Sequence, residues 1–156
     1  MSRKNRYETN YDRLEELMGQ PLGQLESERT YRLRSDQGFM DLVVERLPRC
    51  LETGAAVLSL CHYFEQHGDL CQDPEMTVRV FLPGSTAFLG MVPATDLSHG
   101  RLEALTFQQA IPPIYHEVYP EPGSYHPRLR ESLNDFLTTW LRNLAAQGHR
   151  PVTGDR

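Results

Sequence analysis

The chain has 156 residues, of which 39% are hydrophobic and 24% charged, a composition that suits one globular domain. The formal net charge of -5 argues against a protein that coats nucleic acid, and no apolar run approaches the roughly 20 residues of a membrane span. Three cysteines are too few and too scattered for a disulfide framework, so we expect reduced thiols and a cytoplasmic location.

The N-terminal part of the chain predicts one short helix. Residues 1–6 are polar and are expected to be disordered. Asn10 can cap a helix over residues 11–18, and Gly19 followed by Pro21 would end it.

Alternating apolar and polar residues in the middle of the chain predict β-strands. The turn residues between these segments are typical of an antiparallel meander. The expected strands cover residues 30–34, 39–47, 55–66, 76–82, 101–108 and 114–119. Residues 86–100 are expected to form a loop that tucks Phe88, Leu89 and Met91 against the core. We predict a curved antiparallel sheet of about five strands.

The clearest predicted element is an amphipathic helix over residues 127–147. Pro127 is favoured at a first helical position, and Gly148 supplies the stop. Its apolar residues recur with helical spacing, which predicts that one stripe packs on the sheet and buries Trp140. These residues are Leu129, Leu133, Phe136, Leu137, Trp140, Leu141 and Leu144. The predicted fold is α+β, with this long helix on one face of the sheet and the short N-terminal helix nearby.

All of the predicted elements lie within residues 7–148, which we expect to form a single α+β domain. The residues after Gly148 are polar and carry no apolar periodicity. We therefore expect residues 149–156 to be a disordered tail.

Several segments resemble an uncharacterised bacterial family, the YqiB-like proteins. The resemblance covers residues 7–14, 76–81, 133–142 and 147–149. Others are similar to small related proteins found on plasmids and other mobile elements, at residues 39–45, 62–69 and 119–123. The resemblance implies an α+β fold and a bacterial, cytosolic protein. It implies no activity, because the family has no established catalytic residues, and the stretch 83–96 departs from its pattern.

One group of residues has the chemistry of zinc ligands: Cys61, His62, His67 and Cys71. Their spacing fits no zinc knuckle or ribbon, and neighbouring residues of a strand point to opposite faces. The acidic stretch 67–75 carries three carboxylates but lacks the spacing of a calcium loop. We expect a solvated loop there, no bound metal and no cofactor.

Arg128 and Arg130 fall in the first turn of the C-terminal helix, where a cation opposes the helix dipole. One interpretation is that they pair at the surface with Glu121 or Glu131. The other is that they contact an anionic group of a partner. We expect them to form part of a binding surface.

The function that these features favour is a small non-enzymatic protein-interaction or regulatory protein with an unknown protein partner. Tyrosine supplies contact area and hydrogen bonds at interfaces. The segment before the last helix offers several such side chains, which join Arg128 and Arg130 as predicted binding residues: Tyr115, Tyr119, Tyr125 and His126. A polar sheet face is the second expected contact surface, with Asp41, Glu45, Arg79 and Glu103.

The alternative function is a small-ligand-binding protein or a hydrolytic enzyme that uses a histidine and a carboxylate on the sheet. Its candidate catalytic residues are His62, His116 and Glu117. His62 also suits a structural role, since a buried imidazole needs hydrogen-bond partners. A concave pocket that joins His62 to a carboxylate would favour the enzyme.

Overall fold

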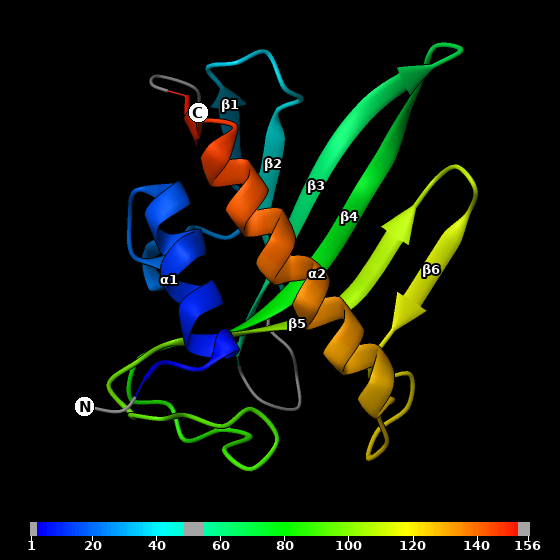
Figure 1. Cartoon of the computed structure of the whole chain (residues 1–156). Coiled ribbons are helices and arrows are strands. Elements are labelled where there is room, and N and C mark those ends of the chain that lie inside the picture. Colours follow the sequence, from blue (N-terminus) through cyan, green and yellow to red (C-terminus); the bar gives the residue numbers. More distant parts are fainter. Residues whose placement is uncertain (1–2, 49–54, 153–156) are drawn as a thin grey trace.

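The computed structural model describes residues 3–48 and 55–152, which form an α+β fold with a seven-stranded sheet (Figure 1). Neighbouring strands are antiparallel throughout, in the order β6-β5-β4-β3-β2-β1-β7. The elements are α1 (Arg6–Met18), the 3-10 turn η1 (Leu22–Gln24), β1 (Thr30–Ser35), β2 (Leu42–Leu47), β3 (Ala56–Gln66), β4 (Asp69–Phe81), β5 (Arg101–Gln109), β6 (Ile114–Glu117), α2 (Pro127–Ala146) and β7 (His149–Pro151). No helix in the described ranges is long and apolar enough to cross a membrane.

The prediction of about five strands is wrong, and the strand that could not be foreseen is β7. Gly148 adopts a φ of 74°, which reverses the chain directly after α2. Arg150 then pairs with Arg34 of β1, so the three residues His149–Pro151 extend the sheet. The expected disordered tail is therefore wrong for His149–Pro151, while residues 153–156 lie outside the described residues.

The first helix begins earlier than its sequence pattern indicated, because its cap is Asn5 rather than Asn10. The Asn5 side chain accepts a hydrogen bond from the Glu8 backbone, and the Glu8 carboxylate accepts one from the Asn5 backbone. Asn10 is instead buried and donates to Thr138 of α2 over 3.0 Å. The expectation that Asn5 and Arg6 are disordered is thus wrong. The prediction that the first helix ends at Gly19 is confirmed, because Gly19 adopts a φ of 68° there.

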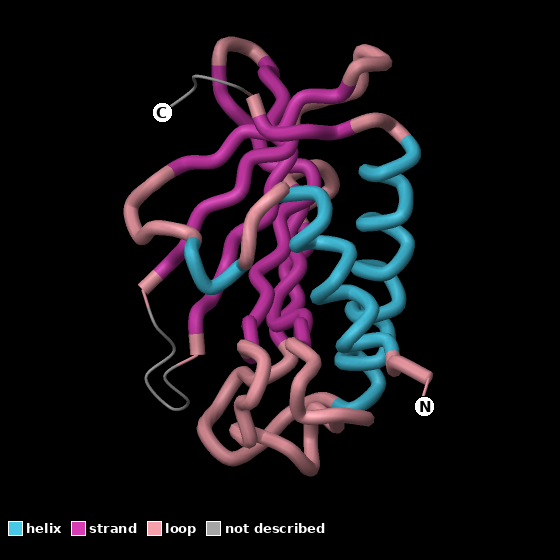
Figure 2. Tube along the Cα trace, turned by 90° about the vertical axis from the view of Figure 1, so that its left-hand side faces the viewer, coloured by secondary structure: helices cyan, strands magenta, loops and turns pink. Residues whose placement is uncertain are grey.

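Both helices lie on the same side of the sheet and cover one face of it (Figure 2). The apolar stripe of α2 packs there, with Leu137, Leu141 and Leu144 fully buried. Trp140 is 7% exposed, which confirms its predicted burial between helix and sheet. The sheet contributes apolar side chains from alternate positions of β1 to β5, so the core is continuous across most strands.

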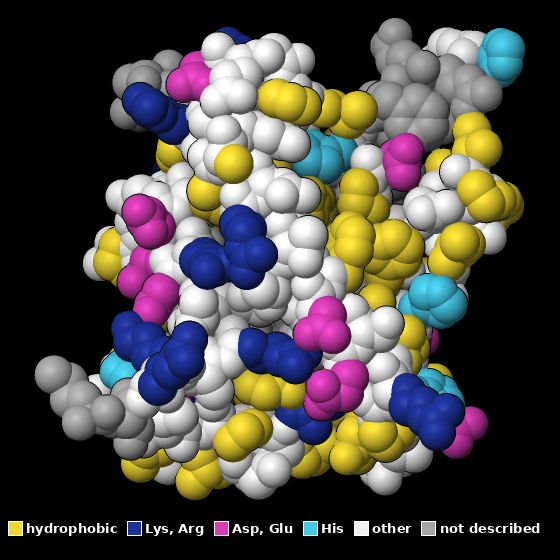
Figure 3. All heavy atoms as spheres, in the orientation of Figure 1, with side chains coloured by type: hydrophobic (Ala, Val, Ile, Leu, Met, Phe, Trp, Pro, Cys, Tyr) yellow, Lys and Arg dark blue, Asp and Glu magenta, His cyan; other side chains and the backbone are white. Residues whose placement is uncertain are grey.

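Phe136 departs from the buried stripe and is 37% exposed. Its ring centroid lies 5.2 Å from that of Phe107 on β5 and 5.8 Å from that of Trp140. Hydrophobic side chains gather beside α2 on this face of the molecule (Figure 3).

The hairpin of β3 and β4 is longer than predicted. His67 and Gly68 form its two-residue turn with φ values of 54° and 83°, the left-handed backbone that such hairpins require. Strand β4 then starts at Asp69 and continues through Pro74. The acidic stretch expected to be a loop is therefore mainly strand.

Candidate functional site

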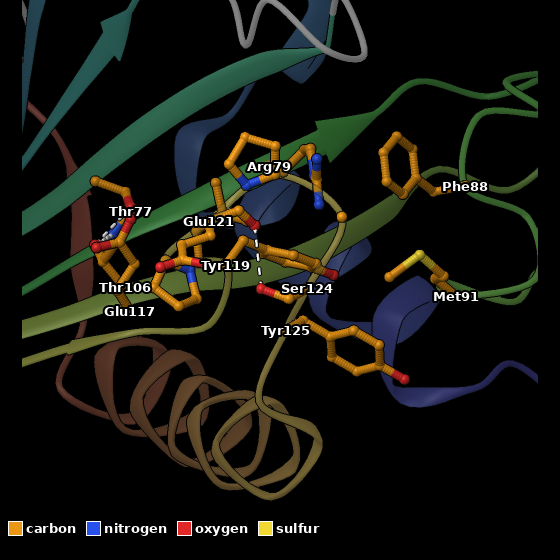
Figure 4. Close-up of a pocket in the computed structure, with 14 residues that line it drawn as sticks. Thr77, Arg79, Phe88, Met91, Thr106, Glu117, Tyr119, Glu121, Ser124 and Tyr125 are labelled. Carbon is orange, nitrogen blue, oxygen red and sulfur yellow. Dashed lines mark hydrogen bonds between the residues drawn. The ribbon is translucent and has the colours of Figure 1, made fainter.

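The site with the clearest geometry is a cavity of about 560 Å³ (Figure 4). Its floor consists of side chains from β4, β5 and β6, and two loop segments wall it. The floor residues alternate with Val78, Val80 and Ala104, which pack into the core under the helices. The cavity thus opens on the sheet face opposite to the helices. Its floor residues are Thr77, Arg79, Leu105, Thr106 and Glu117.

A β-bulge shapes this floor. Thr77 pairs with Thr106 but the next residue, Val78, pairs with Ala104, so Leu105 is an extra residue in β5. Both Leu105 and Thr106 consequently line the cavity. The Thr77 and Thr106 hydroxyls lie 2.6 Å apart, which joins the two strands at the cavity floor.

The deepest polar contact in the floor is the ion pair of Arg79 with Glu103. Nε and Nη2 of Arg79 donate to the same oxygen of Glu103 over 3.2 and 2.8 Å. Both side chains are buried. The guanidinium carbon also lies 4.5 Å from the ring centroid of Phe88 and 5.0 Å from that of Tyr119. The predicted polar contact face is wrong at this pair, because neither charge is exposed.

The other carboxylate oxygen of Glu103 binds residues from two further segments. The Tyr119 hydroxyl donates to it, and burial together with this hydrogen bond raises the pKa of Tyr119. Nε of Arg130 on α2 lies 3.5 Å from the same oxygen. Arg130 is therefore held inside the fold, and neither Glu121 nor Glu131 is its partner in this ion pair.

Residues 119–125 form the first wall of the cavity as a closed loop. The backbone N–H of His126 donates to the carbonyl of Val118 over 2.9 Å and closes the loop at its base. Val118 in turn donates to the carbonyl of Leu105, the bulged residue, over 2.9 Å. Ser124 donates to the carbonyl of Glu121 within the loop, which contains two prolines. Few conformations remain to such a loop, so the wall is largely fixed before anything binds.

Phe88 and Met91 form the second wall, and a buried arginine fixes their segment. The guanidinium of Arg101, 1% exposed, donates to the backbone carbonyls of Val92 and Ser85. These bonds satisfy a side chain that burial would otherwise penalise. This segment is thus a wall of the cavity.

The chain directly after this wall segment is joined to α1 by Glu8, which is fully buried. Its carboxylate accepts hydrogen bonds from the backbone and hydroxyl of Thr95 and from the backbone of Asn5 and Asp96. Burial alone would raise the pKa of Glu8, but these hydrogen bonds outweigh it and lower the pKa to about 2. The ionised carboxylate therefore fastens the second wall to the helix.

The three candidate catalytic residues do not come together. His62 lies on β3, and β4 and β5 separate it from β6, which carries His116 and Glu117. Both ring nitrogens of His62 are engaged, since Trp140 Nε1–H donates to Nε2 over 3.2 Å and Nδ1 lies 2.9 Å from the Asp41 carbonyl. Glu117 lines the cavity, whereas His116 is exposed beside Phe107.

The residues with the chemistry of zinc ligands form no metal-binding group as far as the structure describes their side chains. In the described part of the chain, no three histidine, cysteine, aspartate or glutamate side chains are placed to hold a metal ion. Cys61 is buried, and burial raises the pKa of its thiol to about 12. The side chain of Cys71 lies outside the described residues.

The remaining predicted binding residues take different places. Tyr119 and Tyr125 line the cavity, with ring centroids 5.9 Å apart. Tyr115 is exposed on β6. His126 and Arg128 are exposed at the start of α2.

Several cavity residues escaped the sequence interpretation, namely Thr77, Leu105, Thr106, Ser124 and the prolines of the first wall. A signal existed for the wall, because the run Pro-Glu-Pro-Gly at 120–123 predicts a turn. Leu105 and Thr106 carried none, since a bulge leaves no mark in a period-two pattern.

The model of a family described as a domain of unknown function, DUF6908, matches residues 11–150 of the chain. No curated protein and no solved structure matches the chain. The match supports an uncharacterised family, and gives no support to the narrower YqiB-like resemblance or to a link with mobile elements.

Proposed function

We propose that this chain, which belongs to the DUF6908 family of domains of unknown function, is a non-enzymatic binding domain. Its cavity receives an apolar side chain of a protein partner. The observation that carries the proposal is the pair of fixed walls, residues 119–125 and the segment of Phe88 and Met91, which enclose a mainly apolar cavity.

The composition of the walls supports binding of an apolar group. Phe88, Met91 and Tyr125 present large apolar surfaces, and buried aromatic pockets are where interface binding energy concentrates. Tyr115, which is exposed on β6, has its hydroxyl 3.5 Å from the carboxylate of the cavity residue Glu117 and so adds aromatic surface beside the cavity. A surface of this kind favours a protein partner, whose flanking residues would cover it.

The arrangement gives less support to an enzyme. A hydrolytic site needs a base within hydrogen-bond reach of the reacting group, often with a second group that orients it. The described residues that line the cavity include neither histidine nor cysteine. His62, the strongest candidate base, is engaged on both ring nitrogens by the fold.

Peptide display tests the proposal. Peptides selected on the protein should share an apolar, often aromatic, residue. Ser124→Trp fills the cavity from an exposed loop position and should abolish the selection. Ser98→Trp, at an exposed position in another loop, is the matched control and should leave it intact. Equal selection by the two variants would contradict the proposal.

The second candidate is a small apolar ligand, which the size of the cavity favours. A volume of about 560 Å³ falls in the range of sites for small molecules. In that case the peptides selected by display share no common residue. A small aromatic compound still shifts the resonances of the cavity residues, and Ser124→Trp abolishes these shifts.

A regulatory role in a bacterial cytoplasm, and a mobile-element origin, are part of the same proposal. Only the resemblance of segments such as 39–45 and 119–123 supports them.

A further inference from the structure

The aromatic rings of the cavity already contact arginine side chains. The guanidinium carbon of Arg79 lies over Phe88 and Tyr119, and that of Arg130 lies 5.8 Å from the ring centroid of Tyr125. Arg79 itself lines the cavity, so a second cation placed against these rings would be repelled by its guanidinium. The interior of the cavity therefore favours a neutral apolar group over a charged one.

Two carboxylates at the cavity differ from buried Glu103. Glu117 is half-buried on β6, and Glu121 is exposed in the loop that follows it. Neither takes part in the ion pairs formed among the described residues. Arg79, the cation that lines the cavity with them, faces Glu103. The net charge that an occupant meets at the opening is consequently negative.

These two observations specify the occupant, given the proposed function. We infer that it is a partner segment in which an apolar side chain enters the cavity and a neighbouring basic side chain meets Glu117 and Glu121. Arg128 is exposed at the start of α2, does not line the cavity and forms no ion pair with Glu117 or Glu121 among the described residues. A partner with an acidic residue at that position would meet two like charges and bind more weakly.

Three probes of one shape and different charge test the inference: 2-phenylethylamine, 2-phenylethanol and 3-phenylpropanoate. Each is titrated into ¹⁵N-labelled protein, and the amide resonances of Leu105, Thr106 and the residues of 119–125 other than proline report occupancy of the cavity. The amine should bind about threefold to fivefold more tightly than the alcohol, the range of a partly exposed ion pair, and the carboxylate most weakly. Added salt should reduce the difference.

The double variant Glu117→Gln, Glu121→Gln should remove the advantage of the amine over the alcohol. Glu16→Gln with Glu28→Gln removes two charges at exposed positions far from the cavity residues in sequence, and should retain that advantage. Equal binding of the three probes, or tightest binding of the carboxylate, would overturn the charge inference while the cavity remained a binding site. If no probe shifted the cavity resonances, the proposed function itself would fail.

Discussion

The indole N–H of Trp140 on α2 donates a hydrogen bond of 3.2 Å to Nε2 of His62 on β3. Nε2 must therefore be unprotonated, and Nδ1 carries the proton that it donates to the Asp41 carbonyl over 2.9 Å. This arrangement joins the helix to the sheet. It is the arrangement expected of a structural histidine, which is one of the two roles that the sequence left open for His62.

The burial of Trp140 predicts a large stability loss in Trp140→Ala, about 3–5 kcal/mol in a urea melt. Phe136→Ala is the matched control on the same helix, and it should lose less because Phe136 is 37% exposed. A loss below about 1 kcal/mol for Trp140→Ala would contradict the packing of α2 on the sheet.

The environment of His62 predicts a pH dependence of the unfolding free energy. Burial lowers the pKa of His62, which outweighs the hydrogen bond to Asp41 that raises it. The unfolded chain therefore binds the proton first. The stability that the protein gains by burying neutral His62 is complete above the pKa of about 6.5 in the unfolded chain. It is lost as pH falls from there toward the lower pKa of His62 in the folded protein. In urea melts, the unfolding free energy should fall less between about pH 7.5 and 5.5 in His62→Gln than in the wild type. If it fell equally in both proteins, His62 would not be the source of this pH dependence.

Glu103 should be the most sensitive carboxylate of the cavity floor. Glu103→Gln removes the charge that Arg79 and Arg130 both face inside the fold, which should cost about 3–5 kcal/mol. Glu117→Gln, at a half-buried position without an ion pair among the described residues, should change the unfolding free energy by less than about 0.5 kcal/mol. If Glu103→Gln lost as little stability as is expected for Glu117→Gln, the buried network would not stabilise the floor.

Glu8 predicts acid sensitivity in the second wall. Its pKa is lowered to about 2, so its contribution is complete above the ordinary value of about 4.5 and disappears as pH falls toward 2. Glu8→Gln should lower the unfolding free energy at neutral pH. The variant should also lose less unfolding free energy than the wild type as pH falls from about 5 to 3. Hydrogen exchange at Thr95 and Asp96 should rise in the same variant. The exposed variant Glu16→Gln should reproduce neither effect.

Much of the fold could be predicted from local patterns. The stripe of α2 was visible because it repeats over 20 residues, and most strands carry clear alternation. Strand β7 was not, because its three residues show no alternation of apolar and polar side chains and depend on pairing with β1. The true cap was present as the spacing of Asn5 and Glu8, but Asn10 nearer to the apolar stripe offered an equally valid signal.

The site was predicted only in part, because it depends on contacts between distant segments. Tyr119 and Tyr125 were expected to bind a partner, and they line the cavity. Arg130 was expected at a binding surface or paired with Glu121 or Glu131, but it lies inside the fold and faces Glu103, which is 27 positions earlier in the sequence. Strand alternation placed Arg79 and Glu103 on one polar face. It could not show that residues 85–92 and 119–125 fold back over that face.

The most direct measurement of the central claim is the set of nuclear Overhauser contacts between bound 2-phenylethylamine and the side chains of the protein. The cavity predicts contacts from the aromatic protons of the probe to Met91 and Leu105. Contacts to the aromatic surface beside α2, at Phe136 and Phe107, would place the ligand on the opposite face of the sheet and contradict the account.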